Sequence, residues 1–230
     1  MEITADILLK AYAIGVFPMA ESHDAAELHW IDPRQRGVLP LNSLHIPRSL
    51  RKTLRKEPFR IRCDTAFMQV MEACAEPRPD RSETWINPQI KRLYQQLFQT
   101  GFAHSVECWK DGRLVGGLYG VSLGSAFFGE SMFSRETNAS KVALVHLVAR
   151  LKKSGYSLLD TQFLTRHLAR FGVIEIPRDT YHQRLDMALQ IGATLDPELS
   201  REELEEFIRS CQGNPPAPSP DNLETDPDND

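Results

Sequence analysis

Three polar side chains lie at the ends of two apolar segments, and their chemical types suit a reaction centre. Glu130 follows one apolar run, and Asp160 and Gln162 belong to the next. Successive side chains of a strand point to opposite faces, so we expect Asp160 and Gln162 to share a face and Thr161 to point away. Arg135 follows closely enough to pair with Glu130. A buried acid is costly without a partner, and the residues alone leave open whether each site is structural or catalytic.

A carboxylate beside an amide favours the orientation of an incoming amine. Both groups offer acceptor oxygens, and neither is a usual covalent nucleophile. Ser131 follows Glu130 but has no histidine nearby in the sequence to act as its base. The sequence has no H-E-x-x-H zinc helix, no Walker A loop and no G-x-G-x-x-G loop. These features disfavour nucleophilic, metal-dependent and nucleotide-dependent chemistry.

A basic segment precedes these residues. Its five cations, at i, i+3, i+4, i+7 and i+8, fall on one face of a helix; they are Arg48, Arg51, Lys52, Arg55 and Lys56. Like charges at this spacing repel one another weakly, and an anion would relieve that repulsion. The face is therefore either a contact for a phosphate backbone or a solvated helix surface.

Turn and periodicity signals predict the elements that position these residues. Asp111-Gly112 between alternating apolar segments indicates a hairpin. Strands in series, followed by helix, strand and helix, are typical of a mixed sheet. We expect helices at about 5–14, 48–56, 65–75, 88–100, 139–154, 165–170 and 178–190, strands at 59–63, 104–110, 114–121, 126–129 and 158–162, a short extended piece at 37–46 and a loop at 21–35.

The fold class predicted by these elements is α+β (mixed α/β). We expect a small N-terminal domain at residues 1–45 and a catalytic domain at 46–211. Residues 212–230 hold five of the 15 prolines and little that is apolar, so we expect a disordered acidic tail.

The composition is that of an ordinary globular protein, with 230 residues of which 41% are hydrophobic. No run approaches the ~18 apolar residues of a membrane span, and the start has no signal-peptide pattern, so we expect a cytoplasmic protein with no membrane partner. The four cysteines lack zinc-site spacing and are expected to be reduced. Net charge is −4, yet residues 1–195 carry 25 basic and 20 acidic side chains. One hypothesis is that the acidic tail competes with a polyanion for the basic helix.

Taken together, the motifs resemble those of the leucyl/phenylalanyl-tRNA–protein transferase family. Each is weak alone, but their order and spacing are specific. They read YAIGVFP at 12–18, WIDPRQRGVL at 30–39, LHIPRSL at 44–50, TWI at 84–86, HSVE at 104–107, LVGGLYGV at 114–121, FGESMFS at 128–134, NASK at 138–141 and EIPR at 175–178.

The resemblance implies an enzyme that moves Leu or Phe, and also Met, from aminoacyl-tRNA to the N-terminal Arg or Lys of proteins, which marks them for degradation. It implies an acetyltransferase-like (GNAT-like) catalytic domain and no metal or cofactor. We separately expect a monomer. Gln162 would accept the amine proton with Asp160 polarising it, Glu130 would hold the acceptor or the site geometry, and the basic helix would bind tRNA. Trp85 would bound the terminal adenosine or the pocket mouth. The expected amino-acid pocket comprises Leu118, Phe127, Met132, Ser134, Leu144, Leu147 and Leu159.

Two positions depart from the family pattern. Met19 stands where the family often has Trp, and Thr165 where it often has Asn. A related aminoacyl-tRNA–protein transferase with shifted specificity is therefore the main alternative. A small-molecule N-acetyltransferase would need a glycine-bearing phosphate loop before a helix, and residues 134–139 contain no glycine. A non-enzymatic RNA-binding module would leave Asp160 and Gln162 unexplained.

Overall fold

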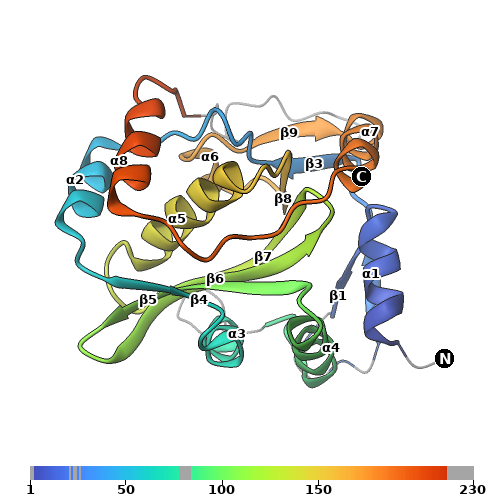
Figure 1. The fold of residues 1–230 in the computed structure, drawn as a ribbon. Coiled ribbons are helices and arrows are strands. Elements are labelled where there is room, and N and C mark those ends of the chain that lie inside the picture. Colours follow the sequence, from blue (N-terminus) through green and yellow to red (C-terminus); the bar gives the residue numbers. More distant parts are fainter. Residues whose placement is uncertain (1–2, 21, 23–24, 26, 78–83, 217–230) are drawn as a thin grey trace.

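A seven-stranded mixed sheet organises the molecule, in the order β4-β5-β6-β7-β8-β3-β9 (Figure 1). The computed structural model describes residues 3–216 except 21, 23–24, 26 and 78–83. The strands are β3 (Gln35–Val38), β4 (Arg60–Cys63), β5 (Ala103–Lys110), β6 (Arg113–Leu123), β7 (Ala126–Ser134), β8 (Leu158–Gln162) and β9 (Ile174–Pro177). Neighbouring strands run antiparallel except β7 and β8, which are parallel. The predicted α+β class with a mixed sheet is confirmed.

The parallel pair β7–β8 places the two polar sites at the same edge. Parallel neighbours need a crossover connection, and α5 (Ala139–Lys153) provides it. The register pairs Phe128 with Asp160. Glu130 and Gln162 each lie two residues further along their strands, so the fold brings them toward one another.

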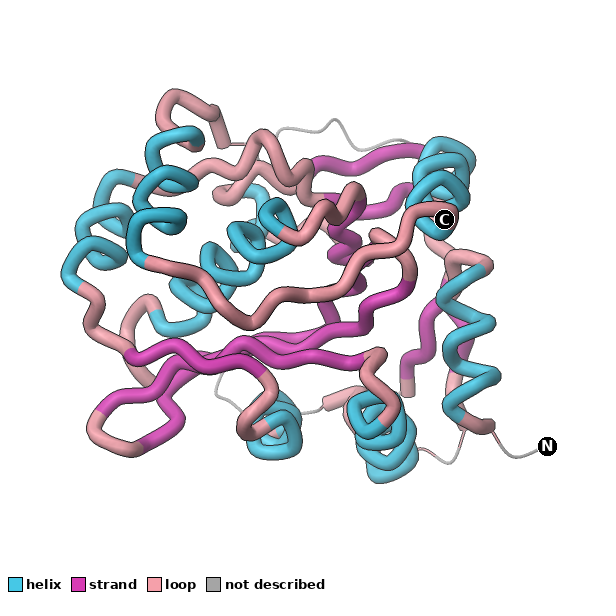
Figure 2. Tube along the Cα trace, viewed as in Figure 1, coloured by secondary structure: helices cyan, strands magenta, loops and turns pink. Residues whose placement is uncertain are grey.

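Helices cover both faces of the sheet (Figures 1 and 2). On one face α5 packs against β5 and β6, and α2 (Arg48–Lys56) and α8 (Arg201–Ser210) pack against α5. On the other lie α3 (Phe67–Ala75) and α4 (Pro88–Gln99). Two apolar cores result, one around α5 and one shared by α1 (Ala5–Ala13), α3, α4 and α7 (Arg178–Leu189).

The N-terminal segment lies beside this sheet. Helix α1 begins after Thr4, whose hydroxyl accepts a hydrogen bond from Ile7 N at 3.3 Å. A two-stranded sheet follows, made of β1 (Phe17–Met19) and β2 (His29–Ile31). The prediction of a loop over 21–35 was therefore wrong at β2, since a three-residue strand shows no clear alternation. Strand β3 falls within the expected domain 1–45, yet it is an internal strand of the large sheet.

Most predicted helices and strands form, and the bounds of α2 and β8 match the predicted ones. Strand β7 continues five residues beyond its predicted end, to Ser134. Strand β9, helix α8 and the short helix α6 (Arg166–Ala169) complete the fold. The first two were missed, although Ser200 and Glu203 form a capping box at the start of α8, which is a readable signal.

The beginning of the expected tail packs onto the body. The Asn214 side-chain amide donates to Asn42 O at 3.4 Å and to Leu44 O at 3.1 Å. The predicted disorder of the remaining tail falls on residues 217–230, which lie outside the described residues.

Candidate active site

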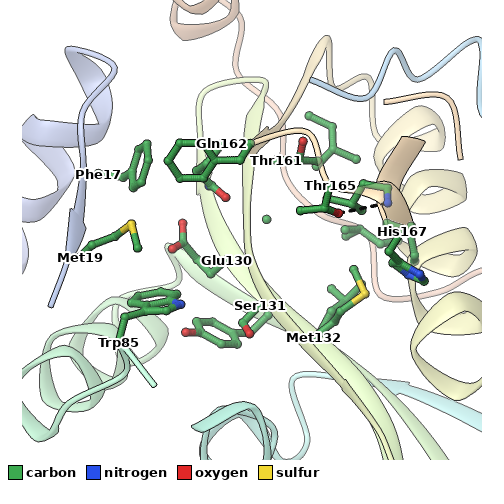
Figure 3. A pocket seen from close by; sticks show the side chains of 18 of the residues that line it. Phe17, Met19, Trp85, Glu130, Ser131, Met132, Thr161, Gln162, Thr165 and His167 are labelled. Atoms are coloured by element: carbon green, nitrogen blue, oxygen red, sulfur yellow. Dashed lines mark hydrogen bonds between the residues drawn. The ribbon is translucent and has the colours of Figure 1, made fainter. Parts of the chain in front are cut away.

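A cavity of about 280 Å³ opens where the middle of β7 and the end of β8 meet β1 and α6 (Figure 3). Its walls are mainly apolar. Six of the eight residues expected to bind the substrate line it, namely Trp85, Leu118, Met132, Leu144, Leu147 and Leu159. Residues from β1 and the β8–α6 segment complete the wall, and sequence reasoning did not place them there: Phe17, Pro18, Thr161, Phe163, His167 and Leu168.

The other two expected pocket residues lie elsewhere. Phe127 is fully buried in the core around α5. Ser134 is exposed at the end of β7, where its hydroxyl donates to Glu136 O at 2.8 Å and accepts from Ser140 N at 3.2 Å. Ser134 thus contributes to the start of α5 rather than to the cavity wall.

Glu130 faces the cavity and is held by two tyrosine hydroxyls. Tyr12 donates to Oε1 at 2.7 Å and Tyr94 donates to Oε2 at 2.9 Å, and the two hydroxyls also contact each other. Burial raises the pKa of Glu130 to about 7, although the two hydrogen bonds act in the opposite direction. Burial raises the pKa of both tyrosines, so they remain neutral donors.

The expected ion pair between Glu130 and Arg135 does not form. Because β7 runs on to Ser134, it carries Arg135 away from the cavity. There Arg135 Nη2 bonds Glu76 Oε1 at 2.5 Å. Glu130 therefore has neutral donors where sequence proximity suggested a cation.

Asp160 is fully buried beneath the cavity and is not part of its wall. Its carboxylate accepts from Arg36 Nε at 3.0 Å and Nη2 at 2.7 Å, and from the Tyr181 hydroxyl at 2.8 Å. Gln162 N completes the set at 2.8 Å. Both oxygens are thus occupied by protein donors, and the contact with Gln162 runs through its backbone.

Gln162 lines the cavity from the end of β8, so its side chain occupies a different environment from that of Asp160. Its φ is +58°, in the left-handed region that few residues other than glycine adopt, and this ends the alternation of the strand. Gln162 Nε2 and Thr161 Oγ1 are buried without a hydrogen-bond partner. Native proteins rarely leave such groups unpaired, so both atoms are available to a ligand.

Two family models match this chain, and together they cover most of its length. The leucyl/phenylalanyl-tRNA protein transferase model matches residues 38–186, and the model of the N-terminal domain of that transferase matches residues 1–34. This chain belongs to the leucyl/phenylalanyl-tRNA–protein transferase family.

Three curated relatives share this family name. The protein from Paramagnetospirillum magneticum is 64% identical over 84% of this chain and 93% of its own length. Those from Rhodospirillum rubrum and Phenylobacterium zucineum are 60% and 61% identical, over 83% and 84% of this chain and 90% and 87% of their own lengths. A solved structure of L-PGS from Bacillus licheniformis is 12% identical with a TM-score of 0.39, over 70% of this chain and 53% of its own, which is too low to support an argument.

The predicted basic face of this family member forms on α2. Leu50 and Leu54 are buried against the core, and Arg48, Lys52 and Arg55 are exposed. Among the described residues, no carboxylate lies within 4 Å of the five cations of α2, so their charges are available to a partner.

One motif typical of serine hydrolases has a structural role in this protein. Residues 120–124 read G-V-S-L-G and match the nucleophile-elbow pattern. An elbow places its serine on a strand-to-helix turn, whereas Ser122 lies within β6 and hydrogen-bonds the Tyr156 hydroxyl at 2.6 Å. Ser122 is therefore not an exposed nucleophile.

Two other kinds of feature are absent from the described part of the chain. Within it, no three His, Cys, Asp or Glu side chains group in a way that would hold a metal ion. None of its helices combines the length and apolar character needed to cross a membrane.

Proposed function

We propose that this protein transfers Leu or Phe, and also Met, from aminoacyl-tRNA to the N-terminal Arg or Lys of acceptor proteins, as a cytoplasmic monomer. One observation carries the proposal: a single cavity combines an apolar pocket, one carboxylate and one unpaired amide. Glu130 is the only acidic side chain among the described residues that line it. The family membership supports the same reaction.

The apolar end of the cavity suits the transferred amino acid. Five aliphatic side chains line it, namely Leu118, Met132, Leu144, Leu147 and Leu159. A wall of flexible aliphatic side chains accepts Leu, Phe and Met, because each methylene changes binding by only about 1–3 kcal/mol. Smaller or polar amino acids would leave the pocket unfilled or their polar groups unpaired.

The opposite end suits the tRNA terminus. Trp85, Phe17 and Met19 lie together on the far side of Glu130 from Met132 (Figure 3). Aromatic faces stack nucleobases, at about 1–3 kcal/mol per base. A terminal adenosine held there would direct its ester toward the middle of the cavity, where Glu130 and Gln162 lie.

The reaction needs positioning more than activation, because an aminoacyl ester is already reactive. The acceptor nitrogen attacks the ester carbonyl, the new amide C–N bond forms, the ester C–O bond breaks, and the ribose hydroxyl leaves as the nitrogen loses a proton. Glu130 attracts the cationic N-terminal residue of the acceptor. Gln162 orients the reacting groups through its unpaired amide. Asp160 acts on Gln162 through the backbone.

A transfer assay tests the proposal by crossing several aminoacyl-tRNAs with several peptides. Leu-, Phe- and Met-tRNA should label peptides that begin with Arg or Lys, and Asp- or Glu-initiated peptides should stay unlabelled because Glu130 repels them. Absence of transfer from every aminoacyl-tRNA would refute the proposal.

Shifted specificity is the second candidate, because both departures from the family pattern line the cavity. Met19 replaces a ring at the proposed adenosine end. Thr165 uses its hydroxyl to accept from Leu168 N at 3.2 Å, capping α6. Transfer to Asp- or Glu-initiated peptides, or from aminoacyl-tRNAs other than these three, would favour this candidate.

A further inference from the structure

We propose that Arg36 is a positioning residue that aligns the two sides of the active site, an inference that rests on the proposed aminoacyl transfer. Arg36 touches neither the cavity nor, in our scheme, the substrate. Its guanidinium holds Asp160, and through Asp160 the backbone of Gln162. The same guanidinium holds Gly15 and Phe17, which belong to the N-terminal segment. One planar group thereby sets where the proposed adenosine wall lies relative to the reacting amide.

The hydrogen bonds of Arg36 reach both sides. Nε and Nη2 contact the Asp160 carboxylate at 3.0 and 2.7 Å, and Nη1 donates to Gly15 O at 2.9 Å. Fork-like contacts of this kind fix orientation as well as distance. The first pair fixes β8, and the third fixes the chain between α1 and β1.

Stacking adds a second constraint. The guanidinium lies between two rings, 4.6 Å from the centroid of Phe17 and 4.3 Å from that of Tyr181. Phe17 itself lines the cavity. A lysine would keep the charge but lose the planar fork and the stack, so the geometry requires arginine.

The downstream effect falls on Gln162. Its left-handed backbone is a sparsely populated conformation that persists only where the surroundings fix it. Asp160 Oδ1 accepts its N–H at 2.8 Å, and the Tyr181 hydroxyl and Arg36 keep that carboxylate in place. Space is limited as well, because a Cβ at Gly37 would meet the Phe163 carbonyl carbon at 2.6 Å. Release of Asp160 would let Gln162 turn away from the cavity.

Arg36 and Asp160 lack access to substrate. They are 1% and 0% exposed, and both carboxylate oxygens are taken. The pair is a support for the reacting groups and exchanges no proton with them.

The test is steady-state transfer by Arg36→Lys, with tRNA affinity measured separately by fluorescence anisotropy. We expect kcat to fall about a hundredfold, as small misplacements do. The KM for peptide should stay within about twofold, because Glu130 is untouched. The Kd for tRNA should rise by much less than kcat falls, because α2 is untouched and only the stack of Arg36 on Phe17 is lost. A kcat within about threefold of wild type would overturn the proposal, whereas an inactive wild type would instead refute the proposed function.

Tyr181→Phe keeps the test informative if Arg36→Lys does not fold. It removes one hydroxyl from Asp160 but keeps the ring under the guanidinium, and we expect kcat to fall about tenfold. Tyr156→Phe is the matched control, since it removes a buried hydroxyl bonded to Ser122, away from the cavity. The two substitutions should lower the melting temperature by similar amounts, and only Tyr181→Phe should lower kcat. Equal losses of kcat in both would overturn the proposal.

Discussion

Asp160 and Glu130 are two carboxylates on adjacent parallel strands, and they differ in burial and in their partners. Asp160 is fully buried, whereas Glu130 is partly exposed at the cavity. Asp160 has a cation, because Arg36 bonds it directly. Glu130 has only neutral partners, the hydroxyls of Tyr12 and Tyr94. Asp160 is therefore neutralised within the protein, whereas Glu130 leaves its charge for a ligand.

This difference suits Asp160 to supporting the site and Glu130 to recognising a ligand. A buried ion pair that is complete in the protein offers nothing to a substrate, but it fixes geometry, and breaking it leaves an unpaired charge. A carboxylate held by hydroxyls keeps its position and responds to pH and to cations. Burial raises the pKa of Glu130 to about 7. Burial by itself would lower the pKa of Arg36, but its interactions with Asp160, and to a smaller extent with Tyr181 and Asp32, raise it.

The largest effect is expected from Asp160→Ala. Transfer should fall by about 10²- to 10³-fold because Gln162 loses its support, and the free energy of unfolding should fall by about 3–5 kcal/mol because Arg36 becomes an unpaired buried charge. Kinetics and denaturant unfolding measure the two effects, with exposed Asp179→Ala as the control. Near wild-type transfer by Asp160→Ala would show that this carboxylate is not a support at all.

Glu130→Gln should separate activity from stability. We expect kcat/KM for an Arg-initiated peptide to fall about ten- to hundredfold, the worth of a charge-assisted hydrogen bond of about 1.5–3 kcal/mol. Binding of tRNA should not change. An equal loss with Leu- and Arg-initiated peptides would show that Glu130 does not recognise the acceptor cation.

The same substitution, Glu130→Gln, should increase stability at high pH although it lowers activity. The pKa of Glu130 is raised from 4.5 to about 7 in the fold, so its contribution is most favourable below pH 4.5 and is lost as the pH rises through 7. Glu130→Gln removes that loss. At pH 8 the variant should be more stable than wild type by about 3 kcal/mol at most, and at pH 4 the two should be alike, as denaturant unfolding at both values can show.

The two carboxylates also show which parts of the site the sequence predicts and which it does not. The sequence alone singled out Glu130, Asp160 and Gln162, because polar residues that interrupt apolar strand patterns are a local signal. Their partners could not be predicted, because Arg36 lies 124 residues from Asp160 and Tyr12 lies 118 residues from Glu130. No periodicity connects such positions, and only the packed sheet brings them together.

Sequence patterns predicted a feature correctly where the feature depends only on the local backbone geometry. The cationic face of α2 needs only helical spacing, and its bounds were predicted correctly. The pairing of Glu130 with Arg135 was inferred from nearness in sequence, and it is wrong because β7 does not end at Gly129. The family resemblance implied Phe127 in the pocket, but Phe127 is fully buried in the core around α5.

Charge reversal on α2 tests whether tRNA binding is separate from the roles of Asp160 and Glu130 at the cavity. Arg51→Glu with Arg55→Glu should weaken tRNA binding by roughly tenfold at low salt and reduce the slope of log affinity against log salt by about 2, one unit for each phosphate that these arginines no longer neutralise. The kcat at saturating tRNA should not change. An unchanged salt slope would mean that α2 is only a solvated surface.

The smallest effect is expected from Tyr12→Phe, and it bears most directly on Glu130. The Tyr12 hydrogen bond lowers the pKa of Glu130, so its removal should move that pKa above 7. If the ionised carboxylate binds the acceptor, kcat/KM for peptide rises with pH through the pKa of Glu130, and the rise should shift to higher pH in the variant. A hydrogen bond to a charged group contributes about 1.5–3 kcal/mol and one to a neutral group about 1 kcal/mol. Because a pKa unit is about 1.4 kcal/mol, this difference corresponds to a shift of roughly one unit. Tyr156→Phe, which loses a hydroxyl elsewhere, should leave the profile in place. A profile that does not move in Tyr12→Phe would mean that another group controls the pH dependence and that Glu130 resembles Asp160 in serving only as support.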